Sequence, residues 1–119
     1  MTEWNGSALA QLLEGTIGTR RTESLLGVLE VPRALLKSSA GAVPRAVLAM
    51  AMDLVLFEDL LRRVPYGDLY VKQQVREGRK LVYDHGALRT VKTPSGELLP
   101  GHLAFARILE PLGYQVNGV

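Results

Sequence analysis

The hydrophobic residues of this chain recur at helical spacing in its middle and at a different spacing further on. The clearest pattern alternates steps of three and four positions, and it comprises Val47, Met50, Leu54, Phe57, Leu61 and Val64. This spacing puts all six on one helix face, so it predicts a helix that runs to about Arg63. Pro44 suits the first helical position, where its missing N–H costs nothing. The Pro, Tyr and Gly at 65–67 predict the end of this helix.

Shorter helices are predicted on both sides of the long one. Apolar spacing indicates helical turns over residues 7–14 and 22–30, and further helices over 69–77 and 103–112. Asp68 is a suitable cap for the third of these. The residues predicted to break or end the short helices are Gly15, Gly18, Pro32, Gly78 and Gly113.

The pattern after residue 78 is typical of strands. Residues 81–83 and 88–91 read as strands, 93–96 as a turn, and 114–116 as the start of another strand. We therefore predict an α+β fold in which a helical N-terminal part precedes the start of a βαβ module. A sheet needs about three strands for independent stability. The partner strands come either from 81–91 alone or from sequence beyond these residues, and we favour the second.

Composition excludes several classes of protein. The 119 residues are 47% hydrophobic and 22% charged, as expected for a folded domain, and they contain no cysteine. Disulfide scaffolds, thiolate metal sites and cysteine nucleophiles are thus ruled out. The longest apolar run, residues 46–57, is too short to span a bilayer, and the first residues do not read as a signal peptide. We expect a cytoplasmic protein with no membrane partner.

Charge is unevenly distributed along the chain. Residues 1–60 hold five basic and seven acidic side chains, whereas residues 61–119 hold nine and five. A basic C-terminal half suits an anionic ligand, but scattered arginines do not form a stripe that follows phosphates. We expect no nucleic-acid partner.

Two histidines restrict the candidate chemistry. On a strand, residues four apart share a face, so His85 and Arg89 point the same way. A neutral imidazole is a ligand for Fe(II) or Zn(II), and a guanidinium grips a carboxylate with two hydrogen bonds. The alternative is a half-buried histidine with solvated neighbours. His102 lies in no metal-binding motif and reads as a surface histidine near a helix start.

Two adjacent carboxylates near the end of the predicted long helix are interpreted as members of surface ion pairs. Glu58 and Asp59 each precede an arginine by four residues, which predicts the ion pairs Glu58–Arg62 and Asp59–Arg63 on a solvated face. Asp53 interrupts the apolar run, and it faces either water or a basic residue elsewhere.

Three segments resemble a known family: VPYGDLY at 64–70, DHGALRTV at 84–91 and FARILEPLGY at 105–114. They are similar to the N-terminal part of the 2-oxoadipate dioxygenase/decarboxylase family, Fe(II) enzymes of lysine catabolism with a vicinal-oxygen-chelate-like fold. These enzymes convert 2-oxoadipate and O2 to 2-hydroxyglutarate and CO2.

The resemblance implies roles for two residues. It makes His85 one of three iron ligands and a contact of the 2-oxo acid, and it places Arg89 on the substrate carboxylate. The other two ligands, a histidine and a glutamate, come from beyond residue 119. On this reading, residues 1–40 are a helical extension and residues 41–119 are the N-terminal part of the enzyme domain. The alternative is a non-enzymatic domain that binds an anionic metabolite or a complementary polypeptide.

Overall fold

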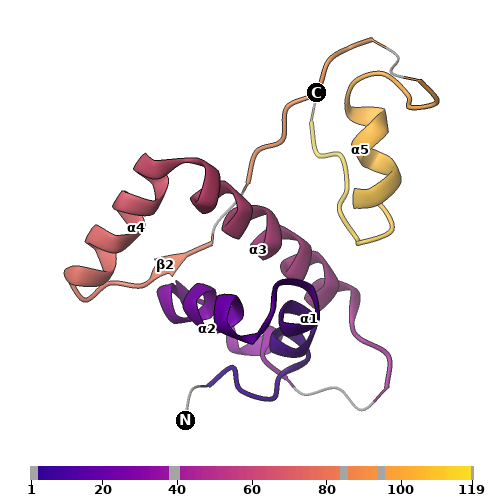
Figure 1. Cartoon of the computed structure of the whole chain (residues 1–119). Coiled ribbons are helices and arrows are strands. Elements are labelled where there is room, and N and C mark those ends of the chain that lie inside the picture. The colour runs from indigo at the N-terminus through magenta and orange to yellow at the C-terminus, as the bar shows by residue number, and fades with distance from the viewer. Residues whose placement is uncertain (1–2, 38–40, 84–85, 94–95, 119) are drawn as a thin grey trace. The chain divides into compact units, whose positions relative to one another are not determined.

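The computed structural model describes the chain except for residues 1–2, 38–40, 84–85, 94–95 and 119. Two compact units are formed, Met1–Asp84 and His85–Val119. Helices dominate, and the first unit also holds a two-stranded parallel sheet (Figure 1). This confirms the predicted α+β class. The domain boundary predicted at residue 40 falls inside the first unit.

The first unit begins with two short helices joined by a glycine. Helix α1 (Ala8–Ile17) is capped by Ser7, whose Oγ accepts the N–H of Ala10 at 3.1 Å. Such a cap satisfies one of the amide donors left free at a helix start. Gly18, at φ +86°, separates α1 from α2 (Thr19–Val28). Both predicted helices therefore exist, but Gly15 lies inside α1 and does not break it.

The predicted long helix is α3 (Arg45–Arg63), and it holds the core of the first unit together. Pro44 caps it. Its residues Val47, Met50 and Leu54 are buried, as their spacing predicts, and they pack with apolar side chains of α1 and α2. The fully buried leucines of this core are Leu9, Leu13, Leu26 and Leu54. The predicted stripe thus faces the core along most of α3.

A small parallel sheet joins two segments that are distant in sequence. Strand β1 (Leu29–Glu30) pairs with β2 (Leu81–Val82), with Leu29 opposite Leu81. The helix predicted to reach residue 30 therefore ends at Val28. Between β1 and α3 lies the 3-10 turn η1 (Arg33–Leu35).

Helix α4 (Pro65–Arg76) follows α3 after a single residue. The predicted start at residue 69 is wrong because Pro65 occupies the first helical turn, where a proline is tolerated. Asp68 lies in that turn and pairs with Lys72 at 2.6 Å. The predicted stop at Gly78 is confirmed: Gly78 has φ +77°, and the N–H groups of Gly78 and Arg79 bond to the carbonyls of Val75 and Gln74.

The second unit contains α5 (His102–Leu109). Gly113, at φ +99°, closes this helix: its N–H bonds to the Glu110 carbonyl, and that of Tyr114 bonds to the Leu109 carbonyl. Residues 88–91 and 114–116 form no strand, contrary to prediction. Instead, the Val91 carbonyl accepts the Gly101 N–H at 2.9 Å, which ties the segment to the start of α5. No helix within the described ranges is long and apolar enough to cross a membrane.

Candidate functional site

The two predicted site residues differ in what the structure says of them. His85 lies outside the described residues. Arg89 is exposed, and it makes no ion pair with a carboxylate in the described part of the chain. Because residues 88–91 form no strand, a shared strand face does not place Arg89 beside His85. The roles of both residues remain predictions that rest on the resemblance.

His102 is the first residue of α5, directly after Gly101, and it is exposed. This is the surface position near a helix start that its sequence context predicts. Over residues 3–37, 41–83, 86–93 and 96–118, no group of three His, Cys, Asp or Glu could hold a metal ion. The described residues by themselves therefore do not fit the three-ligand iron centre that the resemblance implies.

Tyr83, the last described residue before His85, packs against α3. It directly follows β2, and its ring meets that of Phe57 edge to face, with centroids 5.5 Å apart at 69°. Burial of the hydroxyl, and then the negative charge of Asp53 on α3, raise the pKa of Tyr83 above its ordinary value of 10.0. The sequence leaves the direction of Asp53 open, and in the structure its charge acts on the Tyr83 hydroxyl.

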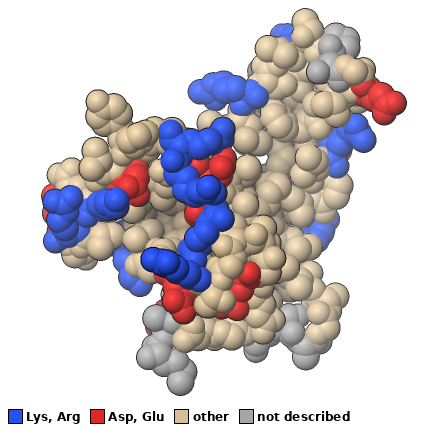
Figure 2. Space-filling model, in the orientation of Figure 1, with Lys and Arg blue, Asp and Glu red and all other residues tan. Residues whose placement is uncertain are grey.

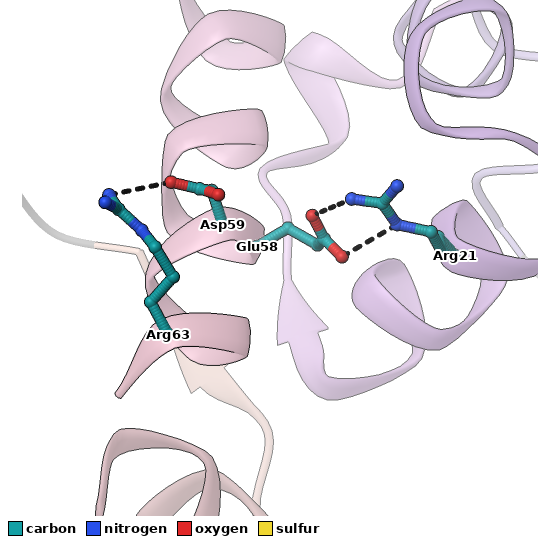
Figure 3. Close-up of polar contacts among 4 residues, drawn as sticks. All are labelled: Arg21, Glu58, Asp59 and Arg63. Carbon is teal, nitrogen blue, oxygen red and sulfur yellow. Dashed lines mark hydrogen bonds and ion pairs between the residues drawn. The ribbon is translucent and has the colours of Figure 1, made fainter. Parts of the chain in front are cut away.

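A bidentate ion pair joins α2 to α3. Arg21 donates from Nε to Oε1 of Glu58 at 2.9 Å, and from Nη2 to Oε2 at 2.5 Å (Figure 3). Only 12% of the Glu58 side chain is exposed, compared with 44% of that of Arg21. The hydrogen bonds from Arg21 to Glu58 raise the pKa of the guanidinium.

This interaction corrects one of the two predicted ion pairs. Asp59 pairs with Arg63 at 2.8 Å, one helical turn along α3, as predicted (Figure 3). Glu58 points instead into the interface between α3 and α2, where it bonds to Arg21. Arg62 consequently forms no ion pair with any described carboxylate.

A groove of about 680 Å³ lies beside the Arg21–Glu58 pair, between α2, α3 and α4. Apolar side chains from all three helices line it: Leu25, Val28, Leu61, Val71 and Val75. Its charged lining residues are Arg21, Glu58, Arg62, Asp68, Lys72 and Arg76. The groove thus combines an apolar lining with more cations than carboxylates. We name it the α2–α4 groove.

Basic side chains are prominent on the surface of the molecule (Figure 2). Lys and Arg form a band in this view, with Asp and Glu side chains set among them. The apolar periodicity of the sequence does not reveal the groove, because the lining comes from three helices that do not share one periodic pattern. The excess of basic residues after position 60 was the only related signal.

A comparison with protein-family models found no match, and neither did a comparison with curated proteins. A search of solved structures found a glyoxalase superfamily protein from Ralstonia eutropha JMP134, with 46% sequence identity and a TM-score of 0.83. The match covers 92% of this chain and 35% of that protein. This chain is therefore similar, in both sequence and fold, to about a third of a glyoxalase superfamily protein.

Proposed function

We propose that this chain supplies part of the metal and substrate site of an Fe(II)-dependent dioxygenase/decarboxylase that acts on 2-oxo acids. The observation that carries the proposal is the 46% identity, over 92% of the chain, to a glyoxalase superfamily protein. The DHGALRTV segment at 84–91 adds the resemblance to enzymes that use 2-oxoadipate. In the proposed reaction, 2-oxoadipate and O2 give 2-hydroxyglutarate and CO2.

His85 and Arg89 take different roles in this proposal. His85 offers an imidazole nitrogen to the metal and contacts the 2-oxo acid, whereas Arg89 holds a substrate carboxylate with two charge-assisted hydrogen bonds. The exposure of Arg89 and its lack of an ion pair with a described carboxylate support this role, because its donors are available to a ligand.

A single histidine does not fix a metal, so the site needs donors from elsewhere. We propose a second histidine and a glutamate, supplied by a continuation of the same polypeptide or by a complementary chain. That this chain spans 35% of its structural neighbour is in keeping with such a division of the site. Bound Fe(II) would supply O2 activation, while the contribution of this chain is to bind and orient the 2-oxo acid.

The test is made on the complete translation product of the gene. Its iron content and its 2-oxoadipate-dependent O2 uptake are measured for the wild type and for His85→Ala, Arg89→Ala and His102→Ala. We expect His85→Ala to lose bound iron. A hydrogen bond to a charged group contributes about 1.5–3 kcal/mol, so Arg89→Ala should lower kcat/KM roughly 10- to 150-fold while iron stays bound. His102→Ala should change neither quantity.

Two results would contradict the assignment. Equal loss of iron and of substrate use in Arg89→Ala would remove its role as a carboxylate clamp. Full iron content in His85→Ala would remove the metal role of that histidine. The purified 119-residue chain, checked for folding by circular dichroism, should show no O2 uptake with Fe(II) and 2-oxoadipate.

A further inference from the structure

The α2–α4 groove is built entirely from residues of the first unit, and its lining contains neither of the residues proposed for the metal and substrate site. Its volume of about 680 Å³ is within the roughly 300–1,000 Å³ of small-ligand sites, and such sites are mainly apolar with a few placed polar groups. Charged side chains are numerous in the lining of the groove, but most of the surface that the lining exposes is apolar, as in such sites. Its apolar lining would bind the hydrocarbon part of a ligand, and its charged side chains would determine which polar head group binds.

The charges in the groove are not balanced. Both of its carboxylates are already held: Glu58 by Arg21, and Asp68 by Lys72 at 2.6 Å. The remaining cations, Arg62 on α3 and Arg76 on α4, make no ion pair with any carboxylate in the described ranges. The groove therefore carries two guanidinium groups that no described carboxylate occupies and whose donors can bind an anion.

We propose that the α2–α4 groove binds an amphipathic monocarboxylate, with its aliphatic chain on the apolar lining and its carboxylate on Arg62 or Arg76. Charge complementarity selects this occupant. The guanidinium groups of Arg62 and Arg76 would repel a cationic amphiphile, and a neutral amphiphile would form no ion pair with them. The bidentate Arg21–Glu58 pair stays intact in the complex and keeps the acidic side chain of Glu58 away from the ligand. The size of the groove favours a single small molecule over a polypeptide helix.

The probe for this proposal is dodecanoate, kept below its micelle concentration and titrated into the full chain by calorimetry. We expect one binding site per chain. Octanoate should bind more weakly, by up to roughly fourfold for each methylene removed. Dodecyltrimethylammonium, which has the same chain length and the opposite charge, should bind at least several-fold more weakly than dodecanoate.

Variants locate the site. Exposed ion pairs contribute up to about 1 kcal/mol, so the double variant Arg62→Gln/Arg76→Gln should weaken dodecanoate binding by roughly two- to fivefold. The control is Arg45→Gln, which makes the same substitution once, at an exposed position of α3 outside the groove, and should bind as the wild type does. Circular dichroism verifies that every variant is folded.

Three results would overturn the proposal. The first is equal affinity for dodecanoate and dodecyltrimethylammonium, and the second is unchanged affinity in the double variant. The third is a stable dimer in sedimentation analysis that binds no dodecanoate, which would assign the groove to a second copy of the chain. None of these results bears on iron binding or O2 uptake, so this test and that of the proposed function fail independently.

Discussion

Leu54→Ala tests whether the stripe on α3 holds the first unit together. Leu54 is completely buried in the core that α3 forms with α1 and α2. Truncation removes three carbon atoms and leaves a cavity, and substitutions of this kind cost about 2–5 kcal/mol. Because Leu54 has no exposed surface, we expect a loss in the middle of that range, about 3 kcal/mol. A domain of this size is stabilised by only about 5–15 kcal/mol in total.

Thermal and urea unfolding, followed by circular dichroism at 222 nm, measure this loss. Each kcal/mol corresponds to roughly 4 °C in Tm for a chain of about this length, so Leu54→Ala should lower Tm by about 12 °C. Leu56→Ala is the matched control: it is the same substitution on the same helix, at a side chain that is 44% exposed. It should cost under about 1 kcal/mol. Equal losses for the two variants would refute the proposed role of the α3 stripe.

Three further predictions concern single interactions. Arg21→Gln should lower stability and Tm, because it leaves the Glu58 carboxylate buried without its partner. Gly78→Ala should cost about 1–2 kcal/mol in urea unfolding, since φ +77° is strained for any residue with a Cβ. Burial and Asp53 raise the pKa of Tyr83, so its neutral form stabilises the fold below about pH 10, and this contribution is lost as the pH rises through the higher folded pKa. Tyr83→Phe, compared with wild type in metal-free buffer, should therefore reduce the loss of stability above pH 10.

Each of these predictions has an outcome that contradicts it. Arg62→Gln is the control for the ion pair. If it lowers stability as much as Arg21→Gln does, Glu58 pairs with Arg62 within α3 as the sequence predicts. Gly27→Ala in α2, where an added Cβ meets nothing within 4 Å, should stabilise by about 0.5–1 kcal/mol. If it behaves like Gly78→Ala, backbone conformation is not the cause. If wild type and Tyr83→Phe lose the same stability above pH 10, the ionisation of Tyr83 does not cause that loss.

The helices could be predicted because their signals are local. The spacing of Val47, Met50 and Leu54 is set by the helix itself, so it indicates the buried face before any partner is known. Gly78 and Gly113 were equally clear, since a closing residue with positive φ strongly favours glycine. These features need only the residues within a few positions of each other.

The sheet was harder to predict because strand pairing depends on distant residues. Leu29 and Glu30 continue a helical pattern, yet they form a strand because Leu81 and Val82 lie beside them. Residues 88–91 have the composition of a strand but pair with no neighbouring strand within the described chain. Composition predicts which residues tolerate an extended backbone, but only the fold supplies the pairing partner. The argument that Arg89 shares a strand face with His85 therefore gains no support from residues 88–91.

Glu58 shows how the same limit affects a functional surface. The sequence spacing places Arg62 within reach of Glu58, but an exposed ion pair one helical turn apart contributes only about 0.3–0.5 kcal/mol to stability. In the folded chain Arg21 lies beside Glu58 and donates two hydrogen bonds to its largely buried carboxylate. Such bidentate contacts are stronger than an exposed ion pair one helical turn apart. Because Glu58 bonds to Arg21, Arg62 is left without an ion pair to any described carboxylate, at the edge of the α2–α4 groove. The cation that we propose as an anchor for a carboxylate is thus a consequence of a tertiary contact, and no local pattern in the sequence could have indicated it.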